Sequence, residues 1–361
     1  MATGRIYPTG HVLRGALLGC GAISVYHLRA WSQIDGVEIV ALANRTIEKA
    51  QRRAREFGIS PAHVYSDHRE LLELEDLDFV DIATLPDVHR VQVEDAAARG
   101  VNVLCQKPFA PSMEDAHAMI RACERAGVLF SINENWRWRS WYRELKHLIE
   151  EGAVGRPRYM RFALHTNLTV PGLDGKLPPM LKNQPYKMAM ERLILYEWGI
   201  HLIDVLRYFF GEANWVFGRM DRTSPVCAGE DQALLMLDIG GVICLIDISW
   251  GSIGVEKRAS QLEQATLEGD GGSIELLPDE KDILRISNHE GSQTRPAFDG
   301  SPDEAYQASY NATQAHFAEC LRNGLEPETV ARNNIETLRA TLAAYESAAA
   351  NKVIYLQDAK S

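Results

Sequence analysis

A helical stretch in the middle of the chain carries a polar stripe that could perform acid–base chemistry. Residues 195–211, LYEWGIHLIDVLRYFFG, hold Glu197, His201, Asp204 and Tyr208 at spacings of four, three and four. These spacings place all four side chains on one face of an α-helix whose other faces are apolar. Burying such groups without partners is costly. The stripe therefore either forms a hydrogen-bonded network in the core, without catalysis, or lines a wet cavity where the histidine can accept a proton.

A second candidate for chemistry is Lys107, which stands directly before Pro108 in the stretch CQKPF, residues 105–109. An ammonium group beside a reacting hydroxyl stabilises the alkoxide that forms as the proton leaves. Most lysines only make a surface soluble. A catalytic role for Lys107 therefore depends on which elements surround it.

The first part of the chain, residues 12–134, alternates between short apolar runs and helical patterns. The runs VLRGALLG, VEIVALAN, FVDIAT, VNVLCQ and VLFSIN are separated by helical stretches such as 46–57, 88–99 and 112–126. Buried strands that alternate with helices predict a doubly wound parallel sheet of the α/β class, a Rossmann-type domain. Right-handed crossovers place the ligand crevice of such a sheet at the carboxyl ends of its strands.

A glycine-rich turn follows the first of these strands. Its sequence is Gly19-Cys20-Gly21-Ala22-Ile23-Ser24, and it leads into a helix. Gly19 permits a tight turn, Gly21 lets a pyrophosphate approach the backbone, and the helix N-terminus supplies N–H donors. We therefore predict dinucleotide binding, with a glycine turn that binds no ligand as the alternative.

The end of the second strand bears on which dinucleotide binds. An acid that binds the adenosine ribose often stands there, but this chain has Asn44 followed by Arg45. Asn44 can bond a ribose hydroxyl without repelling a 2′-phosphate, and Arg45 can stack on adenine or pair with that phosphate. Arg45 can equally be a solvated surface charge. The residues permit both NAD and NADP.

The pattern changes after residue 134. Apolar runs such as RPRYMRFALHT, ALLMLDIG, VICLIDISW, ATLEGDG and SIELLP are joined by glycine-rich turns, and Gly240-Gly241 is typical of a hairpin. We predict an α+β domain over residues 135–361, with a large, mostly antiparallel sheet and helices on one side. Its last helix, about 328–351, either packs on the first domain or stays with the second.

The bulk composition excludes several classes of protein. The chain has 361 residues, a formal net charge of -11 and no run of Lys and Arg, which argues against nucleic-acid binding. No apolar stretch is long enough to span a membrane or to act as a signal sequence. The six cysteines are scattered, which indicates a reducing compartment and disfavours a zinc site. We predict a cytoplasmic enzyme without a metal.

Two further stretches could contribute to binding. Trp136 and Trp138 follow the last strand of the first domain, where indole rings suit either a sugar face or domain packing. The segment 168–187 is rich in Pro and Gly, and such a segment beside a site is often a lid, from which Tyr186 could reach a substrate. His165, at the end of the preceding strand, is a weaker candidate.

The motifs GCGAIS, TLPDVH, QKPF and GIHLID, in this order and spacing, resemble the Gfo/Idh/MocA family of sugar and polyol oxidoreductases over roughly residues 12–350. The resemblance implies that Lys107 positions and polarises the reacting hydroxyl, that His201 is the catalytic histidine and that Glu197 is its acidic partner. Asp204 would hold His201 or pair with Arg207. It also implies a homodimer or homotetramer formed through the open face of the second sheet.

Three positions depart from the family pattern. Gln106 stands where the family usually has Glu, Glu197 replaces a more common Asp, and Asn44 replaces an acid that is frequent in NAD-using members. These departures leave substrate geometry and cofactor preference open. The stretches NENWRWRSWYREL, QPY and YEWGIHLID resemble a branch that includes D-apiose dehydrogenases, which implies oxidation of that sugar to its lactone with NAD.

The resulting hypothesis is an NAD(P)-dependent dehydrogenase of a sugar or polyol, with Lys107, His201 and Glu197 as catalytic residues at the crevice between the domains. Two alternatives remain: a family member that retains its nicotinamide for hydrolysis, elimination or transfer between sugars, and a non-catalytic dinucleotide sensor. The predicted cofactor-binding residues are Gly19, Gly21, Ala22, Ile23, Asn44, Arg45, Thr84, Pro86, His89, Gln106, Lys107 and Asn135. The predicted substrate-binding residues are Lys107, Trp136, Trp138, His165, Tyr186, Glu197 and His201.

Overall fold

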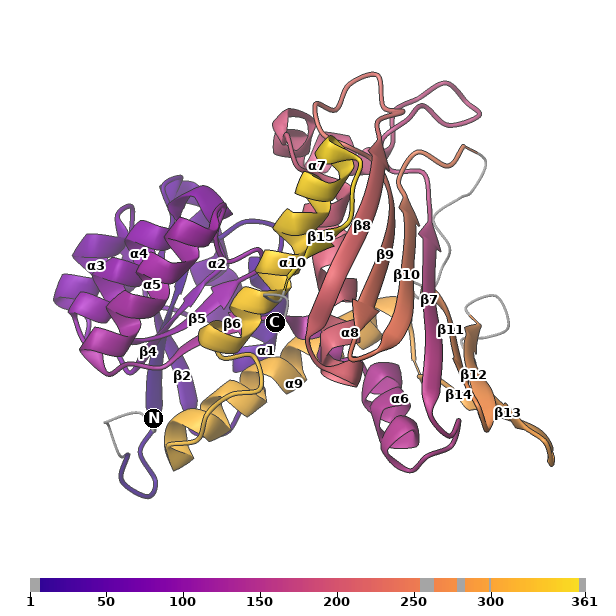
Figure 1. The fold of residues 1–361 in the computed structure, drawn as a ribbon. Coiled ribbons are helices and arrows are strands. Elements are labelled where there is room, and N and C mark those ends of the chain that lie inside the picture. The colour runs from indigo at the N-terminus through magenta and orange to yellow at the C-terminus, as the bar shows by residue number, and fades with distance from the viewer. Residues whose placement is uncertain (1–6, 254–262, 278–282, 299, 357–361) are drawn as a thin grey trace. The chain divides into compact units, whose positions relative to one another are not determined.

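The computed structural model describes residues 7–253, 263–277, 283–298 and 300–356. The chain divides into two compact units (Figure 1). Unit 1 comprises Met1–Trp138 and Tyr306–Leu338, and unit 2 comprises Arg139–Ala305 and Arg339–Ser361. The domain boundary predicted after residue 134 stays a prediction.

Unit 1 is built on a parallel sheet of six strands in the order β3-β2-β1-β4-β5-β6. This order reverses between β1 and β4, and such a switch point opens a ligand crevice at the carboxyl ends of the two strands. The predicted Rossmann-type sheet is confirmed. Its strands are β1 (Leu13–Leu18), β2 (Val37–Ala43), β3 (Val64–Tyr65), β4 (Phe79–Ile82), β5 (Asn102–Gln106) and β6 (Phe130–Asn133).

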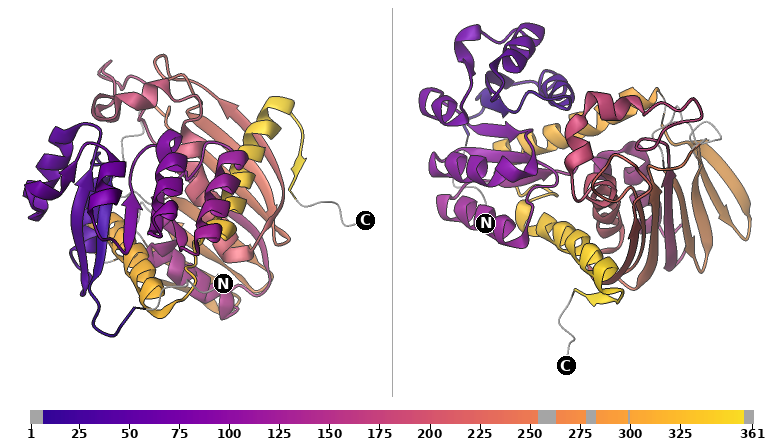
Figure 2. Two further views of the ribbon diagram at one scale, coloured as in Figure 1. Left: turned by 90° about the vertical axis from the view of Figure 1, so that its left-hand side faces the viewer. Right: turned by 90° about the horizontal axis from the view of Figure 1, so that it is seen from above.

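Helices cover both faces of this sheet (Figure 2), and two apolar clusters pack against its strands. One cluster gathers Leu13, Trp31 and Phe79 with Phe317, and a second gathers Leu17 with its neighbours. Most of α9 and the start of α10 belong to unit 1. The helical segments are α1 (Ser24–Trp31), α2 (Ile47–Phe57), η1 (Pro61–His63), α3 (His68–Leu74), α4 (Pro86–Ala98), α5 (Met113–Ala126), η2 (Asn135–Trp138), α9 (Pro302–Asn323) and α10 (Ala331–Ala350).

Unit 2 is built on a sheet of nine strands in the order β14-β13-β12-β11-β7-β10-β9-β8-β15. Among the described strands of this second sheet, only the pair β7 and β10 is parallel, so the predicted mostly antiparallel sheet is confirmed. Gly240 and Gly241, with φ of 58° and 84°, form the predicted hairpin between β9 and β10. The strands are β7 (Pro157–His165), β8 (Ala213–Asp221), β9 (Gln232–Ile239), β10 (Val242–Ser249), β11 (Gln264–Gly269), β12 (Gly272–Leu277), β13 (Ile283–Asn288), β14 (Gly291–Pro296) and β15 (Ile354–Tyr355).

The helices of unit 2 lie on one face of its sheet (Figure 2). Strand β10 shows why, because its residues alternate between buried and partly exposed. Gly199 lets the helix that follows lie close to β10, since a Cβ there would be 3.2 Å from Ile248 Cδ1. The helical segments are α6 (Ser140–Glu150), α7 (Pro179–Asn183), η3 (Pro185–Ala189), η4 (Leu195–Gly199) and α8 (Ile200–Phe210).

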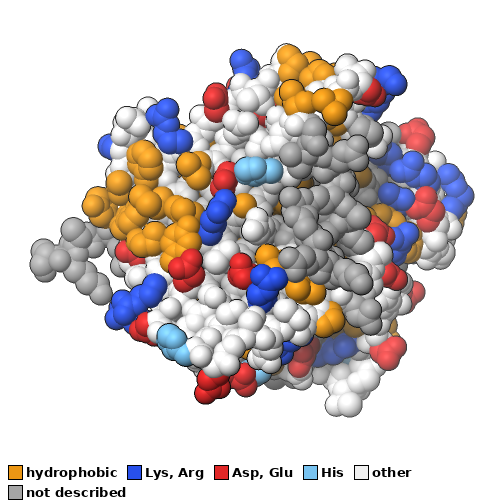
Figure 3. Space-filling view, turned by 90° about the vertical axis from the view of Figure 1, so that its right-hand side faces the viewer, with side chains coloured by type: hydrophobic (Ala, Val, Ile, Leu, Met, Phe, Trp, Pro, Cys, Tyr) orange, Lys and Arg blue, Asp and Glu red, His pale blue; other side chains and the backbone are white. Residues whose placement is uncertain are grey.

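The opposite face of this sheet carries large apolar side chains in water. Leu234, Met236 and Ile243 are 51%, 37% and 36% exposed, and they lie on the adjacent strands β9 and β10. Hydrophobic side chains gather into patches on the surface that Figure 3 shows. A cluster of this kind on one face of a sheet is typical of an interaction surface.

Three further observations concern the residues that the structure describes. Among the helices that the structure describes, none combines the length and the apolar character needed to cross a membrane. All six cysteines are buried free thiols. Within the described ranges, no group of three or more His, Cys, Asp and Glu side chains is placed to hold a metal ion.

Candidate functional site

The glycine-rich turn after β1 contains two glycines, Gly19 and Gly21, with different roles. Gly19 has a φ of 100°, and a Cβ there would lie 2.6 Å from the carbonyl oxygen of Ala83. Gly21 has open space instead, since a Cβ at this position would meet nothing within 4 Å. The first glycine is therefore required by the fold, whereas the second leaves room for a ligand against the backbone. This cradle fits the pyrophosphate of a dinucleotide.

Polar side chains hold the turn in shape. Ser24 Oγ donates to the Gly21 carbonyl at 2.6 Å, and Arg53 Nε donates to Ser24 Oγ at 2.9 Å. Asn44 Oδ1 accepts from the Cys20 N–H at 2.9 Å. Neither the part played by Arg53, which is buried on α2, nor this role of Asn44 was predicted from the sequence.

The remaining residues predicted around the dinucleotide differ in exposure. Ala22 and Arg45 are exposed, while Ile23 is half-buried directly before α1. An exposed Arg45 at the end of β2 lies outside the core and remains compatible with both of its predicted roles. The structure thus brings the turn and the end of β2 together, as predicted for this fold.

The loops after β4 and β5 meet at His89, a fully buried residue of α4. Its Nε2 lies 3.1 Å from the Thr84 carbonyl oxygen and its Nδ1 lies 3.2 Å from the Phe109 carbonyl oxygen. Thr84 Oγ1 in turn donates to Gln92 at 2.7 Å, and Pro86 is the first residue of α4. His89 therefore lies between the two loops inside the protein, and its neutral ring can donate to one of the two carbonyl oxygens. Removal from water lowers its pKa to about 4.

This histidine predicts a pH dependence of stability. Because the pKa of His89 falls from 6.5 to about 4 on folding, the unfolded chain binds the extra proton between those values. The contribution of neutral His89 to the free energy of unfolding is fully present above pH 6.5. It declines by at most about 3 kcal/mol as the pH falls toward 4. Urea unfolding of wild type and His89→Gln at several pH values measures it. The stability difference between the two proteins should shrink with acidification, and a constant difference would contradict the assignment.

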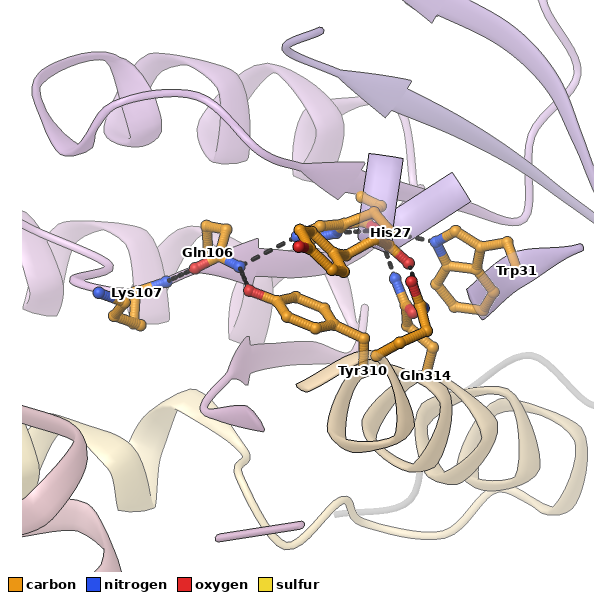
Figure 4. Close-up of polar contacts among 9 residues, drawn as sticks. His27, Trp31, Gln106, Lys107, Tyr310 and Gln314 are labelled. Atoms are coloured by element: carbon orange, nitrogen blue, oxygen red, sulfur yellow. Dashed lines mark hydrogen bonds and ion pairs between the residues drawn. The ribbon is translucent and has the colours of Figure 1, made fainter. Parts of the chain in front are cut away.

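Lys107 lies where the sequence placed it, directly after β5. Gln106, the last residue of β5, accepts the Lys107 N–H on Oε1 at 2.9 Å (Figure 4). Lys107 is half-buried, and its peptide bond to Pro108 is cis. The side chain of Gln106 thus fixes the backbone that carries the lysine.

The residues after β6 are mostly engaged in packing within unit 1. Asn135 is buried and donates to Ser309 Oγ at 2.8 Å. Trp136 is buried, and the Trp138 ring lies 4.7 Å from that of His316, centroid to centroid. The sugar-binding role and the packing role predicted for these two indole rings both stay predictions.

In unit 2, the polar stripe begins in a π-helical turn instead of the regular α-helix expected from its spacing. The N–H of Ile200 donates to the carbonyl of Leu195, five residues earlier. Glu197, inside this turn, forms an ion pair of 2.8 Å with Lys187. Lys187 is only 5% exposed, and its ammonium lies 5.0 Å from the centroid of the Trp250 ring. Single π-turns interrupting helices are frequent at functional sites.

Lys187 was not predicted from the sequence. It follows Tyr186 in the irregular segment, and its only sequence signal was that neighbourhood. Tyr186 itself is 40% exposed and donates to Gln184 Oε1 at 3.0 Å. The segment therefore reaches Glu197 through its lysine.

The next two residues of the stripe are buried in unit 2, and Tyr208 is half-buried. His201 is 3% exposed and Asp204 is fully buried. The Tyr208 ring lies beneath two cations of α6, with Arg143 Cζ at 5.0 Å and Lys146 Nζ at 5.6 Å from its centroid. The catalytic roles of Glu197 and His201 stay predictions.

A half-buried carboxylate, that of Glu230, supports the start of this helical segment. Glu230 Oε1 accepts the N–H groups of Leu193 and Leu195 at 3.0 and 3.2 Å, and it accepts the Tyr345 hydroxyl at 2.6 Å. Desolvation raises the pKa of Glu230. These bonds hold the backbone that leads into Glu197.

His165 lies elsewhere in unit 2. Its Nε2 is 2.8 Å from Asp247 Oδ1, and Asp247 also lies 3.8 Å from the Arg161 guanidinium. All three occupy the face of the sheet opposite the one that α8 covers, as their alternation along β7 and β10 shows. The structure does not bring His165 together with Glu197 and His201.

The geometry of each unit agrees with its match to known families. Residues 13–134 match the model of an oxidoreductase family with an NAD-binding Rossmann fold, Gfo/Idh/MocA. Residues 142–275 match the model of the C-terminal domain of the same family. The chain belongs to the Gfo/Idh/MocA oxidoreductase family. The predicted class of enzyme, an NAD-binding oxidoreductase of sugars and polyols, is confirmed at the level of the family.

Individual members of the Gfo/Idh/MocA family resemble the chain over most of its length. A D-apiose dehydrogenase from Paraburkholderia graminis is 38% identical, covering 95% of this chain and 90% of that protein. A D-apiose dehydrogenase from Rhizobium rhizogenes is 33% identical, covering 95% and 97%. An oxidoreductase from Agrobacterium radiobacter, crystallised with NAD+, L-tartaric acid and magnesium, is 33% identical with a TM-score of 0.86, covering 95% and 98%.

Proposed function

We propose that the chain is an NAD-dependent dehydrogenase that oxidises D-apiose to its lactone. The observation that carries this proposal is its similarity, across 95% of its length, to two D-apiose dehydrogenases. The open cradle at Gly21 supports the cofactor half of the proposal. Pocket shape decides which sugar a family member accepts, so the substrate is what the first experiment must establish.

The chemistry needs a proton acceptor and a group that stabilises an alkoxide. We propose that the imidazole of His201 accepts the proton of the anomeric hydroxyl, while the ammonium of Lys107 stabilises the developing negative charge. Bound NAD supplies the acceptor for the hydride that leaves the same carbon. Glu197 orients the imidazole or the sugar. The carboxylate of Glu197 is itself held by the ammonium of Lys187 at 2.8 Å.

We propose NAD over NADP for this chain. The scyllo-inositol dehydrogenase of Bacillus subtilis, a relative of 27% identity, is named for NAD(+), and the Agrobacterium structure holds NAD+. Asn44 already gives its side chain to the Cys20 N–H and the Thr46 carbonyl. This leaves the exposed Arg45 as the candidate to contact the adenosine end.

The first experiment is nicotinamide reduction by the purified protein, followed at 340 nm. NAD and NADP are each tested against D-apiose, pentoses, hexoses and inositols, and the product is identified by mass. Turnover of D-apiose with NAD, giving the lactone, supports the proposal. Preferred turnover of another sugar replaces the substrate and keeps the reaction class.

The same assay separates the two alternative functions. If the protein retains tightly bound nicotinamide after purification and releases no NADH, the retained-cofactor chemistry is favoured. If it binds NAD but turns over no sugar, and Lys107→Ala leaves NAD affinity unchanged, the sensor is favoured. A dehydrogenase loses turnover in that variant while NAD affinity is mostly kept.

We further propose that the protein forms a homodimer or homotetramer in the cytoplasm, through the open face of the unit 2 sheet. Met236 on that face has Phe217 and Leu245 as cross-strand neighbours, and a second copy would remove these apolar groups from water. Charged side chains, among them Arg161 and Asp247, border the patch. The six buried free thiols are compatible with a reducing compartment.

A charge placed in this patch should reduce assembly. Met236→Lys is expected to shift the protein toward the protomer, because each apposed copy would bury an unpaired ammonium. The mass from light scattering after size exclusion measures the change. Gln51→Lys, which adds the same charge on the exposed side of α2, is the control and should leave the mass unchanged. An unaltered mass in Met236→Lys would place the interface elsewhere.

A further inference from the structure

A buried polar network in unit 1 reaches Lys107 through Gln106, and the sequence motifs did not predict it. Its anion is Asp81 on β4, which is fully buried. Asp81 Oδ2 accepts from Trp31 Nε1 at 2.7 Å and from Gln314 Nε2 at 3.1 Å, and His27 Nδ1 lies 2.7 Å away (Figure 4). All three groups face Oδ2, where hydrogen bonds stabilise a buried negative charge. The other oxygen, Oδ1, is buried and has no hydrogen-bond partner among the described residues.

The network continues from His27 to the residue before Lys107. His27, fully buried on α1, places Nε2 at 3.0 Å from Gln106 Nε2. Gln106 also lies 3.4 Å from the Tyr310 hydroxyl, which is 3.2 Å from that of Tyr306. Burial raises the pKa of Tyr310 well above its ordinary value, so this hydroxyl stays neutral.

The hydrogen bond to Lys107 decides how the Gln106 amide is turned. The backbone N–H of Lys107 can only donate, so the atom that faces it at 2.9 Å must be the amide oxygen. The NH₂ group then faces His27 Nε2 and must donate to it. His27 Nε2 therefore carries a lone pair, and the ring proton sits on Nδ1, where it is donated to Asp81.

We propose that Asp81, His27 and Gln106 form a relay that positions Lys107 for the reaction. The fixed negative charge of Asp81 selects the Nδ1–H form of neutral His27, whose Nε2 turns the Gln106 amide so that its oxygen holds the Lys107 N–H. The three are positioning residues that act through Lys107. The proposal rests on the proposed role of Lys107 in catalysis.

The relay also explains why an amide at position 106 suits this chain. Gln106 stands where the resemblance leads one to expect Glu, and a carboxylate there could accept from Lys107 but could not donate to His27. In a Gln106→Glu variant, His27 would lie between two carboxylates and would have to carry a proton on both nitrogens. In the wild type, three described groups face His27, namely Asp81, Gln106 and Tyr310, and of these three only Asp81 is an anion.

The protonation form of His27 is the direct test, and it needs no activity. Long-range ¹H–¹⁵N spectra of histidine-labelled protein at pH 7 distinguish the forms of the ring, and His27→Gln identifies the signal of His27. We expect a neutral ring with the proton on Nδ1 in the wild type. Gln106→Glu should give a ring protonated on both nitrogens. A proton on Nε2 in the wild type, or the same form in both proteins, overturns the relay.

The kinetic test asks whether these residues act as one unit. His27→Gln and Gln106→Met are each expected to lower kcat roughly tenfold, and the double variant should lose little more than either, because residues in one chain of hydrogen bonds are not additive. Independent losses that multiply in the double variant would contradict the relay. Far-ultraviolet circular dichroism and urea unfolding confirm that each variant is folded.

Failure of the relay and failure of the proposed function give different results. If Lys107→Ala keeps full turnover, the proposed role of Lys107 is wrong, and the spectra of His27 still report on the network. If Lys107→Ala is inactive while His27 has the wrong form, the function stands and the relay does not.

Discussion

His201→Ala is expected to lower kcat on the preferred sugar by roughly 10²–10⁴-fold, the usual contribution of a positioned general base. The KM for NAD should change little, because the variant removes a group that acts on the hydroxyl. Initial rates at saturating NAD measure the effect. A logarithmic plot of kcat against pH should also lose the limb that the imidazole produces in the wild type.

The matched control is His147→Ala, an exposed histidine on α6 of the same unit that pairs with Glu151 at 3.2 Å. It should keep kcat within about twofold, as surface changes away from a site usually do. Equal losses in both variants would assign the effect to folding. Full activity in His201→Ala would remove the histidine from the mechanism and leave the buried network as the account of the stripe.

Gly21→Val is expected to raise the Kd for NAD by roughly 10–100-fold with the free energy of unfolding unchanged. A Cβ at this position would meet no protein atom within 4 Å beyond the adjoining residues, so we expect the folded protein to tolerate the substitution. The same space must receive the pyrophosphate, and overfilling a packed site costs about 1–3 kcal/mol. Calorimetric titration with NAD and urea unfolding measure the two quantities.

Gly19→Ala should show the reverse order of effects. Its methyl group would meet the Ala83 carbonyl oxygen at 2.6 Å in a backbone of φ 100°, which destabilises the fold by at least about 1–2 kcal/mol. Gly19 is therefore expected to be required for stability, and Gly21 for NAD binding. If Gly21→Val binds NAD normally, the open space has another purpose.

Much of the fold could be predicted because hydrophobic periodicity is strong in the parts that form it. Strands β4 and β5 of unit 1 are rich in apolar residues and buried along their whole length, and Gly240-Gly241 has the composition of a tight hairpin. The unpredicted strands lack this signal. β14 is exposed along its whole length, and β8 contains a bulge between Ala213 and Trp215.

The helix α9 was not predicted from the sequence, and the physical reason is different. It buries polar side chains, including Ser309, Thr313 and Gln314, where a pattern of apolar residues would be sought. Two of these side chains have partners far away in the sequence: Gln314 donates to Asp81, 233 residues before it, and Ser309 accepts from Asn135, 174 residues before it. Local composition does not contain that information.

The residues of the candidate site also differ in whether the local sequence could predict them. Lys107 and His201 could be selected because each stands in a recognisable local context, after a strand and on an amphipathic helix. Lys187 could not, since its segment has no period and its partner Glu197 lies ten residues on, within a π-turn. The relay of Asp81, His27 and Gln106 joins three elements, and only the fold brings its members together.

The discontinuity of unit 1 has a consequence for how the protein is made. About 170 residues of unit 2 separate Trp138 from Tyr306, where the chain returns to unit 1. At synthesis rates of about 5–20 residues per second, the nascent Rossmann sheet waits roughly 10–30 s on the ribosome before α9 emerges. Throughout that interval Asp81 lacks Gln314, and the apolar surface that receives Phe317 is uncovered. Nascent chains that stall between these points should therefore be the species that chaperones bind.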